Sequence, residues 1–77
     1  QFRYTQAMDD YAQAIKLPHP ASAYDRRGDA RFKHGDLRGA IADWREAVKH
    51  ESSYERRVSY KIDEAKEKLK KRGLRLF

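Results

Sequence analysis

The chain has 77 residues, of which 39% are charged and 39% apolar, so it is long enough for one small domain and too short for a large core. The absence of cysteine excludes a disulfide framework and thiolate metal sites and favours an intracellular location, and the sequence has no apolar run long enough to span a membrane. Most of the net charge of +6 falls in residues 54–77, which carry nine basic and four acidic residues.

Residues 2–16 are predicted to form a first helix, because apolar residues recur there at three-and-four spacing. The apolar stripe consists of Tyr4, Ala7, Met8, Tyr11, Ala14 and Ile15. Pro18 and Pro20 end this helix, since proline disfavours the helical conformation in the preceding residue and has no amide donor. Because the chain starts with Gln almost inside this helix, we expect it to be a fragment or a processed product.

Two further helices are predicted over residues 21–34 and 37–50, on either side of a Gly35-Asp36 break. Gly28 lies in mid-helix, where glycine costs about 1 kcal/mol relative to alanine, so we expect another helix to touch the backbone there. Gly35 is expected to end its helix and Asp36 to cap the next one. Trp44 belongs to the apolar stripe of residues 37–50 and is expected to fill the space between neighbouring hairpins.

A fourth helix is predicted over about residues 53–72, with a stripe of Val58, Ile62, Ala65 and Leu69. Ser52 and Glu55 have the spacing of a capping box, which is expected to open this helix. Gly73 is expected to close it, which leaves residues 74–77 as a tail.

The first and third predicted helices match each other at a period of 33 residues. Residue types coincide in seven pairs: Tyr4 and Leu37, Ala7 and Ala40, Met8 and Ile41, Asp10 and Asp43, Tyr11 and Trp44, Ala14 and Ala47, Ile15 and Val48. Helix pairs repeated at this length are typical of a solenoid.

Residues 21–52 also carry aromatic and small residues at a characteristic spacing, with the Gly35-Asp36 turn between the two helices. These residues are Tyr24, Gly28, Ala40, Trp44 and Ala47. In this pattern the segment resembles one whole repeat of the tetratricopeptide repeat (TPR) family. It departs from the family at Arg27, Arg31 and Ser52, where leucine, tyrosine and proline are usual. The resemblance implies an all-α, right-handed solenoid of four antiparallel helices, with residues 2–16 as the second helix of a preceding repeat and 53–73 as a capping helix.

The same resemblance implies a protein-binding adaptor or assembly scaffold, and not an enzyme. In the family the first helices of the pairs line a groove that holds a peptide or a partner's helix. The positions implied to face this groove are Ser22, Asp25, Arg26, Asp29, Phe32 and Lys33, continued by Arg56, Ser59, Tyr60 and Asp63. Asp25 and Asp29 stand where the family's carboxylate clamp would need a cation and an amide, so that clamp is not expected. The alternative is a solvated face with pairs such as Asp29–Lys33.

The basic C-terminal segment supports a second hypothesis, in which the protein binds RNA or an anionic surface. The residues concerned are Lys66, Lys68, Lys70, Lys71, Arg72 and Arg75. Aromatic residues are not interleaved among them for base stacking, and Glu64 and Glu67 dilute their charge. The competing interpretation is a solvated helix end whose cations complement the helix dipole.

No catalytic or metal-binding set is evident in the sequence. The three histidines, His19, His34 and His50, lie in loops or at helix ends without ligand spacing. No catalytic triad or phosphate-binding glycine loop is present, so we expect no cofactor and no catalysis. If the first helix is half of a hairpin, its outer stripe lacks a partner, and Phe2, Tyr4 and Tyr11 are expected to be partly exposed. We therefore expect the module to work docked in a larger assembly.

Overall fold

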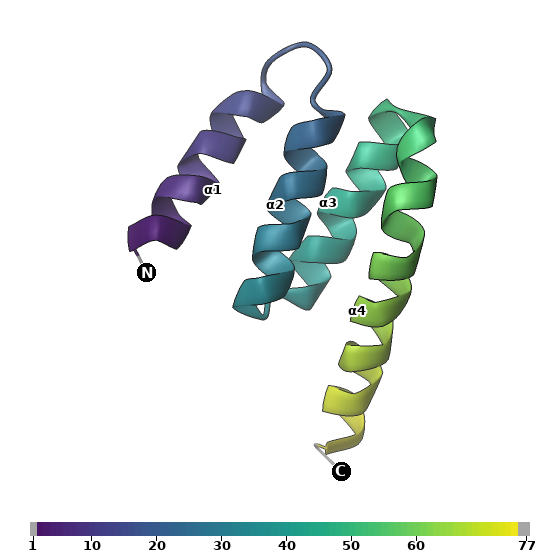
Figure 1. Ribbon diagram of the computed structural model, residues 1–77. Coiled ribbons are helices and arrows are strands. Elements are labelled where there is room, and N and C mark those ends of the chain that lie inside the picture. Colours follow the sequence, from purple (N-terminus) through teal and green to yellow (C-terminus); the bar gives the residue numbers. More distant parts are fainter. Residues whose placement is uncertain (1, 76–77) are drawn as a thin grey trace.

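Four α-helices follow one another in the computed structural model, which describes residues 2–75 and the side chains of residues 3–73 (Figure 1). The helices are α1 (Phe2–Ile15), α2 (Ala21–His34), α3 (Leu37–His50) and α4 (Glu55–Arg75), with a short 3-10 turn over Ser52–Tyr54. Each helix packs on its neighbours in sequence in an antiparallel manner, and the Cα atoms span 44 × 32 × 13 Å. The all-α arrangement of four sequentially packed helices is therefore confirmed.

The turn between α2 and α3 is built by Gly35 and Asp36, as predicted. Gly35 has a φ of 94°, a left-handed conformation that glycine adopts without steric cost. Its amide donates to the carbonyl of Phe32, and the side chain of Asp36 accepts a hydrogen bond of 3.0 Å from the amide of Gly39. One free carbonyl at the end of α2 and one free amide at the start of α3 thereby gain hydrogen-bond partners, which stabilises the close antiparallel hairpin of the two helices.

Both predicted ends of the fourth helix are wrong. The Ser53 hydroxyl donates to Glu51 at 3.0 Å, and the amide of Glu55 donates to the backbone carbonyl of Ser52, so a 3-10 turn takes the place of the capping box. At the other end α4 continues through Gly73 to Arg75, because Gly73 keeps a negative φ and does not form a left-handed cap. Residues 74–75 of the predicted tail therefore belong to α4, and residues 76–77 lie outside the described residues.

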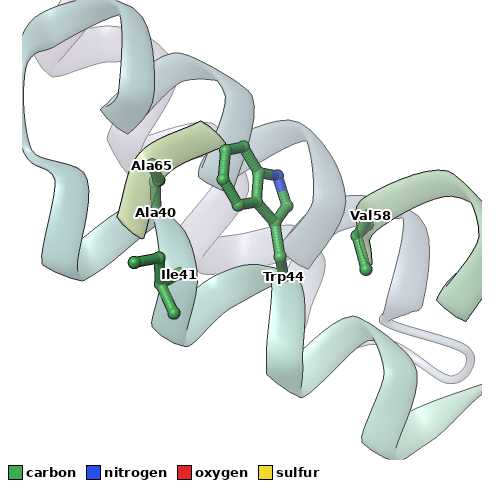
Figure 2. Close-up of a cluster of buried hydrophobic side chains, with 5 residues drawn as sticks. All are labelled: Ala40, Ile41, Trp44, Val58 and Ala65. Carbon is green, nitrogen blue, oxygen red and sulfur yellow. The ribbon is translucent and has the colours of Figure 1, made fainter. Parts of the chain in front are cut away.

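The core lies between α2, α3 and α4 and is centred on Trp44, which is 1% exposed. Figure 2 shows the indole in the middle of the buried group, which comprises Ala40, Ile41, Trp44, Val58 and Ala65. Phe32, Val48, Ile62 and Leu69 pack against this group from its edges. The indole also lies directly against Gly28, so the predicted contact of another helix with the backbone at Gly28 is confirmed, as is the burial of Trp44 in the core.

Helix α1 is the least buried of the four, because none of its described side chains is fully buried. It packs on α2, where the ring of Tyr4 stacks on His34 with centroids 3.8 Å apart. Tyr4 and Tyr11 are both partly exposed, as predicted, whereas the side chain of Phe2 lies outside the described part. Within residues 2–75 no helix is both long and apolar enough to cross a membrane.

Candidate functional site

A small pocket of about 250 Å³ opens between α2 and α4. It is lined by Asp29, Phe32, Lys33, Trp44 and Lys61. Its floor is aromatic, since the ring of Phe32 lies tilted at 44° to the indole of Trp44 with centroids 5.7 Å apart. The pocket brings together Asp29, Phe32 and Lys33, which are three of the residues predicted to line a groove.

One side of the pocket is fixed by Lys61, which joins α4 to α2. Its ammonium group donates to Asp25 Oδ1 at 3.1 Å and to Asp29 Oδ1 at 2.8 Å. Asp29 Oδ1 also accepts a hydrogen bond of 3.1 Å from Nε1 of Trp44, the residue at the pocket floor. The rim and floor are therefore connected by one hydrogen-bonded network, which holds the pocket open in a defined shape.

The charge of Lys61 is maintained by its two acidic partners. Burial alone would lower the pKa of this ammonium group, because a charged group loses hydration inside a protein. The hydrogen bonds to Asp29 and Asp25, together with their negative charges, outweigh burial and raise the pKa of Lys61 above its ordinary value. Lys61 is thus a cation already engaged by the fold.

Two further lysines on this face remain exposed. Lys33 lies at the pocket rim, and Lys68 places its ammonium nitrogen 5.8 Å from the centroid of the Phe32 ring. Among the described side chains, neither lysine forms an ion pair. The predicted Asp29–Lys33 pair does not form, because Asp29 is held by Lys61 instead. The pocket therefore combines an apolar floor with uncompensated positive charge at its edge.

A second ionic network lies between α2 and α3 and was not predicted. Asp43 is 2% exposed and accepts two hydrogen bonds from Arg27, at 2.8 and 2.9 Å, and one from Arg31, at 3.1 Å. The hydrogen bonds to Asp43 raise the pKa of Arg27, against the opposing effect of burial. The two arginines that depart from the family pattern therefore share one buried carboxylate. The available signal was that Arg27 and Arg31 lie one helical turn apart, on the helix that precedes Asp43.

The remaining predicted groove residues lie elsewhere. Asp25 is 7% exposed and bound to Lys61, so it is not available to a partner. Ser22 and Arg26 are exposed and line a separate hollow beside α1. Arg56 and Tyr60 are exposed on α4 but do not line the pocket, although Tyr60 has 63% of its surface exposed. Lys61 was missed, and the signal for it was the pair of acids one helical turn apart on α2.

The basic residues of the C-terminal segment lie along α4. Lys66, Lys70, Lys71 and Arg72 are exposed, and Arg75 ends the helix with its side chain outside the described part. Lys66 lines a hollow of about 300 Å³ together with Arg45 and Val48 of α3. Arg72 donates to the carbonyl of Gly35 at 3.0 Å and so helps to hold α4 against the α2–α3 turn.

Metal-binding geometry is not found in the part of the chain that the structure describes, where no three His, Asp or Glu side chains converge on one point. No protein-family model, curated protein or solved structure matches this chain.

Proposed function

We propose that this chain is a protein-interaction module of the TPR type, which binds a peptide or a partner's helix without catalysing a reaction. The observation that supports this proposal is the aromatic-floored pocket between α2 and α4. Its volume of about 250 Å³ lies below the range of roughly 300–1,000 Å³ for small-molecule sites. A pocket of this size suits one side chain of a bound segment, an anchoring mode common in protein–protein recognition.

The charges around the pocket favour a ligand with an acidic residue beside its apolar anchor. Lys33 and Lys68 are exposed near Phe32 and unpaired among the described side chains, so a ligand carboxylate would gain a cationic partner there. Lys61 contributes less, because Asp25 and Asp29 already balance its charge. The proposed ligand is therefore a segment with an aromatic or large aliphatic residue next to Asp or Glu. The module would act within a larger chain or complex.

A second candidate function is the binding of RNA or an anionic surface through α4. The continuous helix Glu55–Arg75 supports it, because Lys66, Lys70 and Lys71 all remain exposed along its last turns. Binding of this kind depends on phosphate neutralisation and weakens steeply with salt, whereas an apolar anchor is far less sensitive.

The test uses the fluorescence of Trp44, the single tryptophan of the chain, which lines the pocket and so reports its occupancy. The full chain is screened against a random peptide library displayed on phage, and selected peptides are titrated while Trp44 emission is followed. We expect the selected peptides to share an apolar residue adjacent to Asp or Glu. Lys33→Glu should weaken their binding by roughly 2- to 5-fold, the effect expected for one exposed ion pair.

Lys49→Glu is the matched control, because Lys49 is an exposed lysine on α3 that does not line this pocket. Equal weakening by Lys33→Glu and Lys49→Glu, or selected peptides without an acidic residue, would contradict the proposed ligand. A uridine-rich single-stranded RNA of 20 nucleotides is titrated in parallel. RNA binding that is lost in a Lys66→Glu/Lys70→Glu variant and between 50 and 200 mM salt would instead support the second function.

A further inference from the structure

A hollow of about 350 Å³ lies where α1 meets the N-terminal part of α2, away from the α2–α4 pocket. From α1 it is lined by Asp10, Tyr11 and Ala14. These residues are the counterparts, 33 positions earlier, of Asp43, Trp44 and Ala47 in α3. The internal repeat therefore places the same residue types on corresponding faces of α1 and α3.

On α3 this face is covered by α2, and α4 completes the burial of Trp44. Asp43, Trp44 and Ala47 are 2%, 1% and 0% exposed. Three features of α2 meet them: Arg27 and Arg31 hold the carboxylate of Asp43, and Gly28 leaves room for the indole of Trp44. The covering helix thus carries an arginine, a small residue directly after it, and a second arginine one turn further on.

On α1 the corresponding face is covered from one side only, where Ser22, Ala23 and Arg26 of α2 line the same hollow. Asp10 is exposed and forms no ion pair with any described side chain, while Tyr11 and Ala14 are only half-buried. A carboxylate in this position on α3 is neutralised by two arginines, which shows the kind of charge that suits it.

We propose that this face of α1 docks a partner helix with the pattern Arg-(Gly or Ala)-x-x-Arg, its small residue against Tyr11 and its arginines on Asp10. A second copy of this chain does not supply that helix, because its own Arg27-Gly28-x-x-Arg31 segment is already packed on α3. The occupant is therefore a helix of different origin with this chemistry. Docking on this face of α1 does not depend on the α2–α4 pocket or on what binds there.

The test adds such a helix to the chain. A copy of residues 20–36 is joined ahead of Tyr4 in place of residues 1–3, so that the copied Gly-Asp turn precedes Tyr4 as Gly35-Asp36 precedes Leu37. Tethering is used because an isolated helix of this length is marginal in water. We expect the melting temperature, followed by circular dichroism, to rise by about 5 °C or more, and amide exchange in α1 to slow.

Charge reversal then tests the pairing. In the fused chain Asp10→Arg should abolish the rise, and replacing both copied arginines by glutamate in that variant should restore it. Asp9→Arg is the matched control, because Asp9 corresponds to the exposed Ala42 of α3 and lies off the docking face, so the rise should persist. No rise on fusion, or an equal rise with Asp10→Arg, would overturn the proposal. So would dimerisation of the unfused chain, seen by sedimentation and abolished by Asp10→Arg, since a second copy would then cover the face.

Discussion

The indole of Trp44 lies directly on the backbone of Gly28 and leaves no space for a side chain there. A Cβ atom at position 28 would lie 2.5 Å from Nε1 and 2.6 Å from Cδ1 of Trp44. Both atoms belong to a rigid ring that is itself enclosed by the core, so they cannot move aside without repacking. The close approach of α2 and α3 therefore requires glycine at this point of the helix.

We predict that Gly28→Ala destabilises the protein by about 1–3 kcal/mol, because overpacking outweighs the gain of about 1 kcal/mol in helix propensity. Gly73→Ala is the matched control. Gly73 also lies inside a helix, but a Cβ atom there would meet nothing within 4 Å, so this variant should gain up to about 1 kcal/mol. Urea unfolding measures both, and a stabilising Gly28→Ala would show that the indole yields easily.

Removal of the Trp44 side chain should unfold or nearly unfold the domain. Truncation of a buried aromatic residue to alanine costs about 3–5 kcal/mol, while a domain of this size has only about 4–12 kcal/mol in total. Trp44→Ala should therefore show a largely lost or strongly lowered thermal transition by circular dichroism. A variant that melts within a few degrees of the parent would contradict the central position of Trp44 in the core.

Sequence patterns within each segment predicted most helix bounds and the α2–α3 turn. They did not predict which side chains from different helices pair with each other. The bounds of α2 and α3 and the roles of Gly35 and Asp36 follow from residues close in sequence, and all are confirmed. Both ends of α4 depended on which backbone groups pair, so the patterns at Ser52 and Gly73 did not decide them.

In the candidate site, Phe32 and Lys33 of α2 were predicted to face a groove, and the structure places both at the pocket. The partners of the acidic residues were not predicted, because each comes from a helix distant in sequence. From the sequence alone Asp25 and Asp29 are interpreted as surface charges, whereas in the structure both accept hydrogen bonds from Lys61 of α4. Likewise Arg27 and Arg31 are only departures from the TPR sequence pattern, whereas in the structure both donate hydrogen bonds to Asp43 of α3.

Loss of one partner of the Arg27–Asp43 ion pair should lower the free energy of unfolding far more than replacement of both partners by apolar residues. Asp43→Leu alone leaves Arg27 partly buried without its carboxylate and should cost about 3–5 kcal/mol. Arg27→Met combined with Asp43→Leu removes both charges of this pair with similar volume. Arg31 keeps Asp36 as an ion-pair partner at 3.8 Å, so most of that loss should be recovered. Urea unfolding of the two single variants and the double variant gives the coupling free energy. Purely additive losses would indicate that the two side chains act independently.

The Lys61 network should give the protein a specific sensitivity to alkaline pH. Because the folded protein raises the pKa of Lys61, the stabilisation is fully present below the unfolded value of about 10.4 and is lost as pH rises through the folded pKa. At neutral pH Lys61→Met should cost about 1–3 kcal/mol, since Asp25 stays buried without its partner. The difference in unfolding free energy between parent and variant should hold up to about pH 10 and narrow above it. A difference that stays constant to pH 12 would contradict this assignment.

Helix α1 should open independently of the rest of the domain. The only helix with which α1 makes extensive contact is α2, and none of the described side chains of α1 is fully buried. Few apolar contacts therefore protect the backbone hydrogen bonds of α1. Amide hydrogen exchange followed by mass spectrometry should be at least about tenfold faster in α1 than in α2 and α3 after correction for intrinsic rates. Tyr4→Ala should accelerate it further by removing the stack on His34, whereas Gln6→Ala, at an exposed position of the same helix, should not. Equal protection in α1 and α3 would mean that α1 unfolds only together with the whole domain. The partly covered face of α1 would then not lower the local stability of that helix.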